Sequence, residues 1–130
     1  MIFIQKRDGT IVPFNKQKII DAINKAFLEV DGKIYENDTV KDIADEIYHK
    51  AELFYKKSSN TTELSEDATI FKKFFSVENI QDLVEELLMR SERTDVARSY
   101  IRYRYKKEVA RNYEHDFINA IKEKLNASNI

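Results

Sequence analysis

The chain has 130 residues, of which 42% are hydrophobic and 35% are charged. This length is enough for one domain with a real core, and the composition is typical of a soluble globular chain and not of a disordered one. The net charge of −1 gives no overall basic excess that would favour nucleic-acid binding. Without cysteine, the chain has no disulfide, zinc-thiolate, iron–sulfur or thiol-nucleophile chemistry of its own.

No targeting or membrane segment is recognised in the sequence. No apolar run approaches the roughly 18 residues of a membrane span, and the start of the chain, MIFIQKRDG, lacks the layout of a signal peptide. The absence of cysteine fits a reducing compartment. We therefore expect a cytoplasmic protein that binds neither membranes nor nucleic acid.

A β-hairpin followed by a helix is predicted at the N-terminus. Two short β-prone runs flank Asp8-Gly9, and this dipeptide is typical of a two-residue type I′ turn, which needs positive φ at both central residues. Asn15 is a good N-cap for the helix that follows. Asp31-Gly32 is a typical end for that helix.

A second helix is predicted to begin near Asp38, where polar residues offer caps before an apolar stripe. The polar stretch SSNTTELSED, residues 58–67, is predicted to be a loop. The stretch 68–77 is either a third strand beside the hairpin or the start of the next helix, because periodicity cannot decide so short a run.

Two more helices complete the predicted architecture. Ser76 is the predicted N-cap of the third, and Thr94 or Asp95 that of the fourth. The tail, residues 112–130, keeps a helical register and either packs on the other helices or extends away from them. We therefore predict an α+β domain in which a small β-hairpin or three-stranded sheet caps a bundle of about four helices.

The sequence contains no recognisable active site. His49 and His115 are interpreted as surface histidines, and no catalytic triad or metal-ligand spacing is present. The acidic residues between positions 78 and 86 are interpreted as a solvated helix face. We expect this chain not to be an enzyme.

Basic residues on both sides of the hairpin turn make an anion site one interpretation. Lys6 and Arg7 precede the turn, and Lys16 and Lys18 lie in the first turn of the next helix. Two glycines are too few for a glycine-rich phosphate loop, but helix N-termini and basic side chains also bind phosphates. Lysines at a helix N-terminus oppose the helix dipole, and a bound anion would reverse that cost. The alternative is that these lysines are ordinary exposed residues.

A late stretch, VARSYIRYRYKKEVAR, interleaves tyrosines with arginines. Such side chains can stack on a flat base. The alternative is that the tyrosines are half-buried and the arginines pair with the acidic third helix. The residues alone leave both interpretations open.

Three stretches, taken together and in this order, resemble one family. They are KRDGTIVPFNKQKIIDAINKAF (Lys6–Phe27), VENIQDLVEELLM (Val77–Met89) and DVARSYIRYRYKKE (Asp95–Glu108). They resemble the ATP-cone, the allosteric nucleotide-binding domain at the N-terminus of many ribonucleotide reductases, which also occurs in a repressor of reductase genes. Details such as I-Q-D-L-V-E look most like the anaerobic ribonucleoside-triphosphate reductase, and the ending NASNI resembles the linker to its catalytic domain.

The resemblance implies a fold and a function. The hairpin would be a lid, with ATP or dATP, with or without Mg²⁺, bound between it and the helices. ATP would permit activity of the parent oxidoreductase and dATP would inhibit it through a change of oligomeric state. Residues 1–111 would form the cone, and residues 112–130 a helix or linker toward a missing catalytic domain. The expected partners are the nucleotide, that catalytic domain and a second copy of the chain.

The resemblance also implies site residues, with phosphate contacts from the basic ones and a base or sugar contact from Gln81. The implied nucleotide-binding residues are Lys6, Arg7, Asn15, Lys18, Ile19, Gln81 and Lys106. This chain departs from some relatives at Val12, where they have an acidic residue, and at Val77 and Gln81, where they have Thr and His.

Two alternatives to a reductase domain remain open. One is the effector domain of the transcriptional regulator, whose zinc ribbon requires cysteines that this chain lacks. The other is a plain helical interaction module, in which the hairpin cations are only surface residues. Thermal stabilisation by a nucleotide would separate the reductase domain from the plain module.

Overall fold

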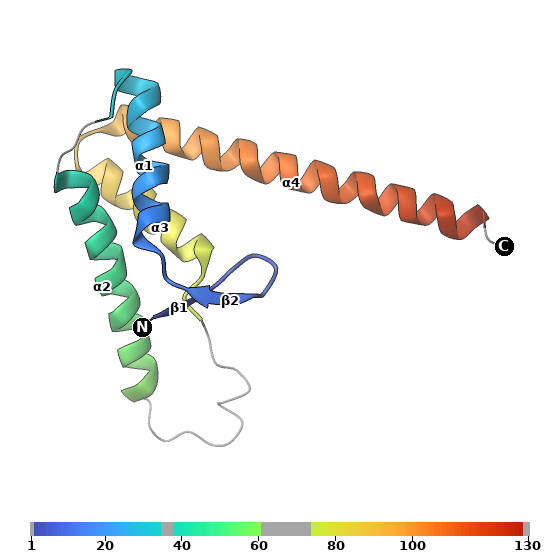
Figure 1. Cartoon of the computed structure of the whole chain (residues 1–130), viewed down its shortest axis with the longest axis horizontal. Helices are drawn as coiled ribbons and strands as arrows, with labels where there is room; N and C mark the ends of the chain where they lie inside the picture. The colour runs from blue at the N-terminus through green and yellow to red at the C-terminus, as the bar shows by residue number, and fades with distance from the viewer. Residues whose placement is uncertain (1, 35–37, 61–73, 129–130) are drawn as a thin grey trace.

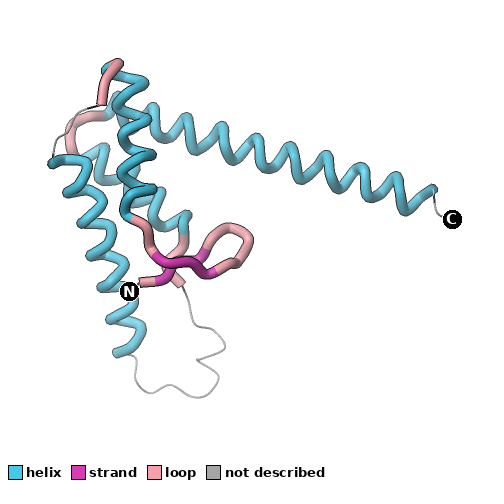
Figure 2. Tube along the Cα trace, viewed as in Figure 1, coloured by secondary structure: helices cyan, strands magenta, loops and turns pink. Residues whose placement is uncertain are grey.

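A computed structural model describes residues 2–34, 38–60 and 74–128. Its elements are β1 (Phe3–Gln5), β2 (Ile11–Pro13), α1 (Lys16–Asp31), α2 (Asp38–Asn60), α3 (Val77–Arg90) and α4 (Thr94–Ser128). The hairpin lies at one end of the helices, and α4 leaves them as a long rod (Figures 1 and 2). The predicted α+β architecture, a small sheet on four helices, is confirmed for the described residues.

The hairpin is confirmed, but its turn differs from the expected two-residue form. The strands pair antiparallel with Ile4 opposite Val12. The Lys6 amide donates to the Thr10 carbonyl and the Gly9 amide to the Lys6 carbonyl, so the turn spans four residues. Gly9 has φ 88°, whereas Asp8 is not in the positive-φ region. One positive φ suits a type I turn followed by a left-handed glycine, which is the common longer hairpin connection.

The segment before α3 lies beside β1. The Gln5 amide donates to the Phe75 carbonyl, and Gln5 forms an isolated parallel bridge with Ser76. The Tyr55 hydroxyl joins both, because it donates to the Phe3 carbonyl and accepts from the Phe75 amide. Among the described residues the sheet has two strands, and residues 68–73 of the predicted third strand lie outside them.

Local capping signals place most helix ends where the sequence predicts them. The Asn15 side chain accepts from the Gln17 amide, and Gly32 ends α1 with φ 73°. Ser76 and Asn79 form a reciprocal capping box at the start of α3. Thr94 is the first residue of α4 and not its cap, because the carbonyl of the residue before it already accepts the first helical bond.

The predicted loop 58–67 is wrong at its start, because α2 continues through Asn60. Lysines and serines without proline or glycine let the helix run on past its apolar stripe. Residues 61–67 of that loop lie outside the described residues.

The core lies between the inner faces of the four helices and is closed at one end by the hairpin. α1 packs on α2 and α4, and α3 packs on α2 and α4. The buried apolar residues are Ile4, Ile19, Ile23, Ala26, Phe27, Val40, Ile43, Ala44, Ile47, Ala51, Phe75, Ile80, Val84, Leu87, Leu88, Val96, Ala97 and Tyr100.

Only the first turns of α4 contribute to this core. The helix is continuous through Ser128, and it extends away from the bundle and does not fold back on it (Figure 1). Phe117, Ile121 and Leu125 lie on this extension and are all exposed. Of the two arrangements expected for the tail, the structure shows the extended one. No helix among the described residues has the length and apolar content needed to cross a membrane.

Candidate functional site

A pocket of about 220 Å³ opens between the hairpin turn and helices α1, α3 and α4. It is lined by Arg7, Ala22, Gln81, Tyr100, Tyr103, Arg104, Lys107 and Arg111. Four of these eight residues are cationic and none is acidic, and two are aromatic. Such a lining favours an anionic ligand with a flat ring system. The volume is below the roughly 300–1,000 Å³ of most ligand pockets, so a ligand of ordinary size would be only partly enclosed here.

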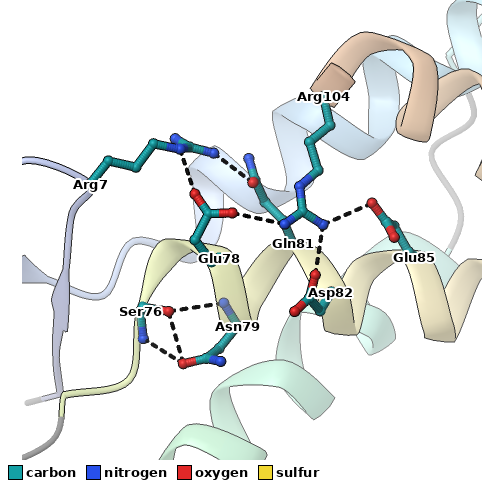
Figure 3. Close-up of polar contacts among 8 residues, drawn as sticks. All are labelled: Arg7, Ser76, Glu78, Asn79, Gln81, Asp82, Glu85 and Arg104. Atoms are coloured by element: carbon teal, nitrogen blue, oxygen red, sulfur yellow. Dashed lines mark hydrogen bonds and ion pairs between the residues drawn. The ribbon is translucent and has the colours of Figure 1, made fainter. Parts of the chain in front are cut away.

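Arg7, in the hairpin turn, contacts α3, which lies more than 70 residues away in the chain. Arg7 Nε lies 2.6 Å from Glu78 Oε1, and Arg7 Nη2 donates to Gln81 Oε1 at 2.6 Å (Figure 3). These two contacts hold the turn against α3. They also show that the charge of Arg7 is neutralised by Glu78, a residue distant in sequence.

Arg104 of α4 is the centre of a larger ionic cluster. Its Nη1 donates to Asp82 at 2.8 Å and to Glu85 at 2.9 Å, and its Nη2 donates to Glu78 at 2.8 Å (Figure 3). The three carboxylates lie on one face of α3 because they are spaced by four and three residues. Burial lowers the pKa of Arg104, but hydrogen bonds to these carboxylates outweigh burial and raise it. The acidic stretch is therefore only partly a solvated face, and for Arg104 the pairing alternative is confirmed.

Two tyrosines of α4 give the pocket its aromatic surface. Tyr100 is buried, and burial raises its pKa to about 12, so its hydroxyl is neutral at physiological pH. Tyr103 is partly exposed, and the Nζ atoms of Lys25 and Lys107 lie 5.8 and 5.5 Å from its ring centroid. An exposed ring with two cations nearby can stack on a base while the cations attract phosphate.

The structure brings some of the predicted site residues together. Arg7 and Gln81 line the pocket and contact each other. Lys6 is exposed in the same turn as Arg7. Lys18 is exposed one helical turn before the lining residue Ala22 and therefore on the same face of α1.

The other three predicted residues lie elsewhere. The Asn15 side-chain oxygen caps α1, and Ile19 belongs to the hydrophobic core. Lys106 is exposed on α4 but does not line the pocket, whereas its neighbour Lys107 does.

Several lining residues were missing from the predicted site, although helical spacing carries a signal for them. Counting from Tyr100, the α4 residues that line the pocket recur after three, four, seven and eleven positions. That spacing defines one helix face. Starting the count at a buried aromatic residue would have selected Lys107 and Arg111.

The histidines show no arrangement for catalysis. His49 and His115 are both exposed, and the ring of His115 lies beside Asn119. No group of three or more histidine or carboxylate side chains is placed to hold a metal ion within the described part of the chain.

The fold and the pocket agree with a known family of regulatory domains. The sequence model of the ATP cone domain family matches residues 2–109. The chain belongs to the ATP-cone family.

Curated relatives that contain similar sequence are ribonucleotide reductases of different kinds. Identity is 41% over 113 residues with the vitamin B12-dependent ribonucleoside-diphosphate reductase of Thermoplasma acidophilum. It is 33% over 120 residues with the ribonucleoside-diphosphate reductase subunit alpha of Chlamydia pneumoniae, and 28% over 129 residues with the anaerobic ribonucleoside-triphosphate reductase of Haemophilus influenzae. The similarity is therefore to reductases in general and does not single out the anaerobic class.

These relatives are much longer than the chain. The alignments cover 83%, 92% and 96% of this chain but only 12%, 11% and 15% of the respective relatives. The chain thus corresponds to a small part of a reductase.

Proposed function

We propose that the chain is the effector-binding domain of a ribonucleotide reductase and that it binds ATP or dATP in the pocket beside the hairpin turn. The observation that carries this proposal is the cationic and aromatic lining of that pocket in a domain of the ATP-cone family. Titration of the chain with both nucleotides tests it. Thermal stabilisation by either nucleotide would also exclude a plain helical interaction module.

The proposed phosphate contacts come from two sides of the pocket. Lys6, Arg7 and Lys18 approach from the hairpin and α1, and Lys107 and Arg111 approach from α4. Charge-assisted hydrogen bonds from such groups are stronger than neutral ones. Lys106, one position from Lys107, remains a proposed contact for a phosphate outside the pocket. Mg²⁺, if it accompanies the nucleotide, would arrive bound to the phosphates.

The proposed base and sugar contacts come from α3 and α4. Tyr103 offers an exposed ring for stacking, and Gln81 offers an amide for a base edge or a sugar hydroxyl. Asn15 and Ile19 would act mainly by fixing the start of α1, because one caps it and the other anchors it in the core. The Arg104 guanidinium is already bound by three carboxylates, so we assign it to holding the site together.

We further propose that effector binding regulates a catalytic domain and is not followed by hydrolysis in this domain. In that scheme ATP permits activity and dATP inhibits it, as the resemblance implies, in a cytoplasmic enzyme. The curated relatives are reductases, so a reductase is the proposed parent and a transcriptional regulator is not. The proposed parent is one of the three kinds of reductase that these relatives represent, the anaerobic enzyme among them.

The exposed α4 extension is the proposed contact for a second copy or for the catalytic domain. We expect the full chain to self-associate weakly, because covering Phe117, Ile121 and Leu125 would contribute several kcal/mol at about 25 cal/mol per Å². A chain ending at Asn112 should associate less. Sedimentation velocity with and without dATP measures both chains.

Two outcomes of that measurement would contradict the expectation. The first is a full chain that stays monomeric at high concentration in every nucleotide state. The second is a shortened chain that associates as strongly as the full one, which would place the contact on the cone.

A further inference from the structure

Glu78 is an acidic residue in direct contact with the cation that the proposed function assigns to an effector phosphate. Its Oε1 lies 2.6 Å from Arg7 Nε, while Gln81 accepts from Arg7 Nη2. Nε and Nη2 form one edge of the guanidinium, and such an edge can pair with a carboxylate or a phosphate through two parallel bonds. Side chains of α3 therefore occupy this edge (Figure 3).

A second arginine fixes the Glu78 carboxylate in this place. Glu78 Oε2 accepts from Arg104 Nη2 at 2.8 Å. Burial raises the pKa of Glu78, but the hydrogen bond from Arg104 and the charges of Arg7 and Arg104 outweigh burial and lower it. A negative charge therefore stands beside Arg7 at neutral pH.

We propose that Glu78 is an internal competitor for Arg7, because its carboxylate occupies the guanidinium edge that an effector phosphate would otherwise use. This inference rests on the proposed function, since competition requires a pocket that takes phosphate. An incoming phosphate either displaces the carboxylate, which breaks the Arg7–Glu78 ion pair, or binds beside it, where the two negative charges repel each other. Glu78 thereby lowers the affinity for the effector.

The structure allows Glu78 to be displaced without breaking the cluster. Its side chain is 49% exposed, so the freed carboxylate can be solvated. Arg104 would keep Asp82 and Glu85 as partners. Displacement would also remove one of the two contacts that hold the hairpin turn against α3, so the same exchange couples effector binding to the position of the turn.

The test is the substitution Glu78→Gln in the full 130-residue chain, with ATP affinity measured by calorimetry at fixed ionic strength. Glutamine keeps the size and one acceptor oxygen for Arg7 but removes the charge. We expect the affinity for ATP to rise about three- to tenfold. Glu85→Gln is the matched control. It also removes a carboxylate of α3 that pairs with Arg104, but Glu85 does not contact Arg7. It should change the affinity by less than about twofold.

A double substitution tests whether Glu78 acts through Arg7. In an Arg7→Ala background, Glu78→Gln should give a smaller gain than in the natural chain, because the contested guanidinium is absent. Thermal unfolding without ATP checks that each variant is folded. Glu78→Ala, which also removes the charge, serves as a second variant.

Several results would overturn the inference. Unchanged or weaker ATP binding by folded Glu78→Gln would mean that Glu78 positions Arg7 and does not compete for it. An equal gain in Glu85→Gln would mean a general charge effect. If neither the natural chain nor Glu78→Gln binds ATP, the proposed function fails and the inference fails with it.

Discussion

Replacement of Arg7 by alanine should weaken ATP binding by roughly tenfold or more, because a hydrogen bond to a charged group contributes about 1.5–3 kcal/mol. Glu78 would keep Arg104 as its partner, so the main effect of the substitution is the loss of the phosphate contact. Calorimetric titration of the folded variant with ATP measures the effect. Lys6→Ala, in the same turn, should weaken binding by a similar order of magnitude.

Lys16→Ala is the matched control for these substitutions. Lys16 also lies at the junction of hairpin and helix, but its Nζ is 3.0 Å from Asp45 Oδ1 and 4.6 Å from the centroid of the Tyr48 ring. It therefore faces α2 and not the pocket. Two results would exclude a specific phosphate contact at Arg7. One is that folded Arg7→Ala binds ATP as tightly as the natural chain. The other is that Arg7→Ala and Lys16→Ala lose the same amount of affinity.

Replacement of Arg104 by methionine should lower the free energy of unfolding by about 2 kcal/mol. The Arg104 side chain is 17% exposed, and its loss leaves Glu78, Asp82 and Glu85 close together without their shared cation. The expected fall in melting temperature is about 8 °C for a domain of this size. Arg102→Met, an exposed arginine two residues earlier on α4, should change stability by less than about 0.5 kcal/mol.

The pH dependence of the stability difference between the natural chain and Arg104→Met provides a second measurement. The pKa of Glu78 in the folded chain is lowered from its ordinary value of 4.5. Its contribution to stability is therefore present above the unfolded pKa and is lost as the pH falls through the folded pKa. The difference in melting temperature between the natural chain and Arg104→Met should be full near neutral pH and shrink below about pH 4. A difference that is independent of pH would show that Arg104 acts through packing alone.

The fold was predictable where the signal is local. Asn15, Gly32 and Ser76 end or begin helices through contacts with residues a few positions away, and the hairpin follows from one dipeptide between two β-prone runs. The turn type was not predictable, because Asp-Gly serves both the short and the longer connection. The start of the loop after α2 was also missed, because a polar stretch without glycine or proline can remain helical.

The site was only partly predictable because it depends on pairs that are distant in the chain. Arg7 and Gln81 were expected, but nothing local to the hairpin indicates that Glu78 neutralises Arg7. The choice between Lys106 and Lys107 depends on the rotation of α4, which is set by the burial of Tyr100. A sequence motif gives the pair of lysines, whereas packing decides which one lines the pocket.

The most direct test of the central claim is calorimetric titration of the 130-residue chain with ATP and dATP side by side. We predict saturable binding of both nucleotides, with dissociation constants on the order of 10⁻⁶–10⁻⁴ M and a rise in melting temperature as the nucleotide saturates. Absence of binding heat up to millimolar concentrations, together with an unchanged melting temperature, would contradict the account.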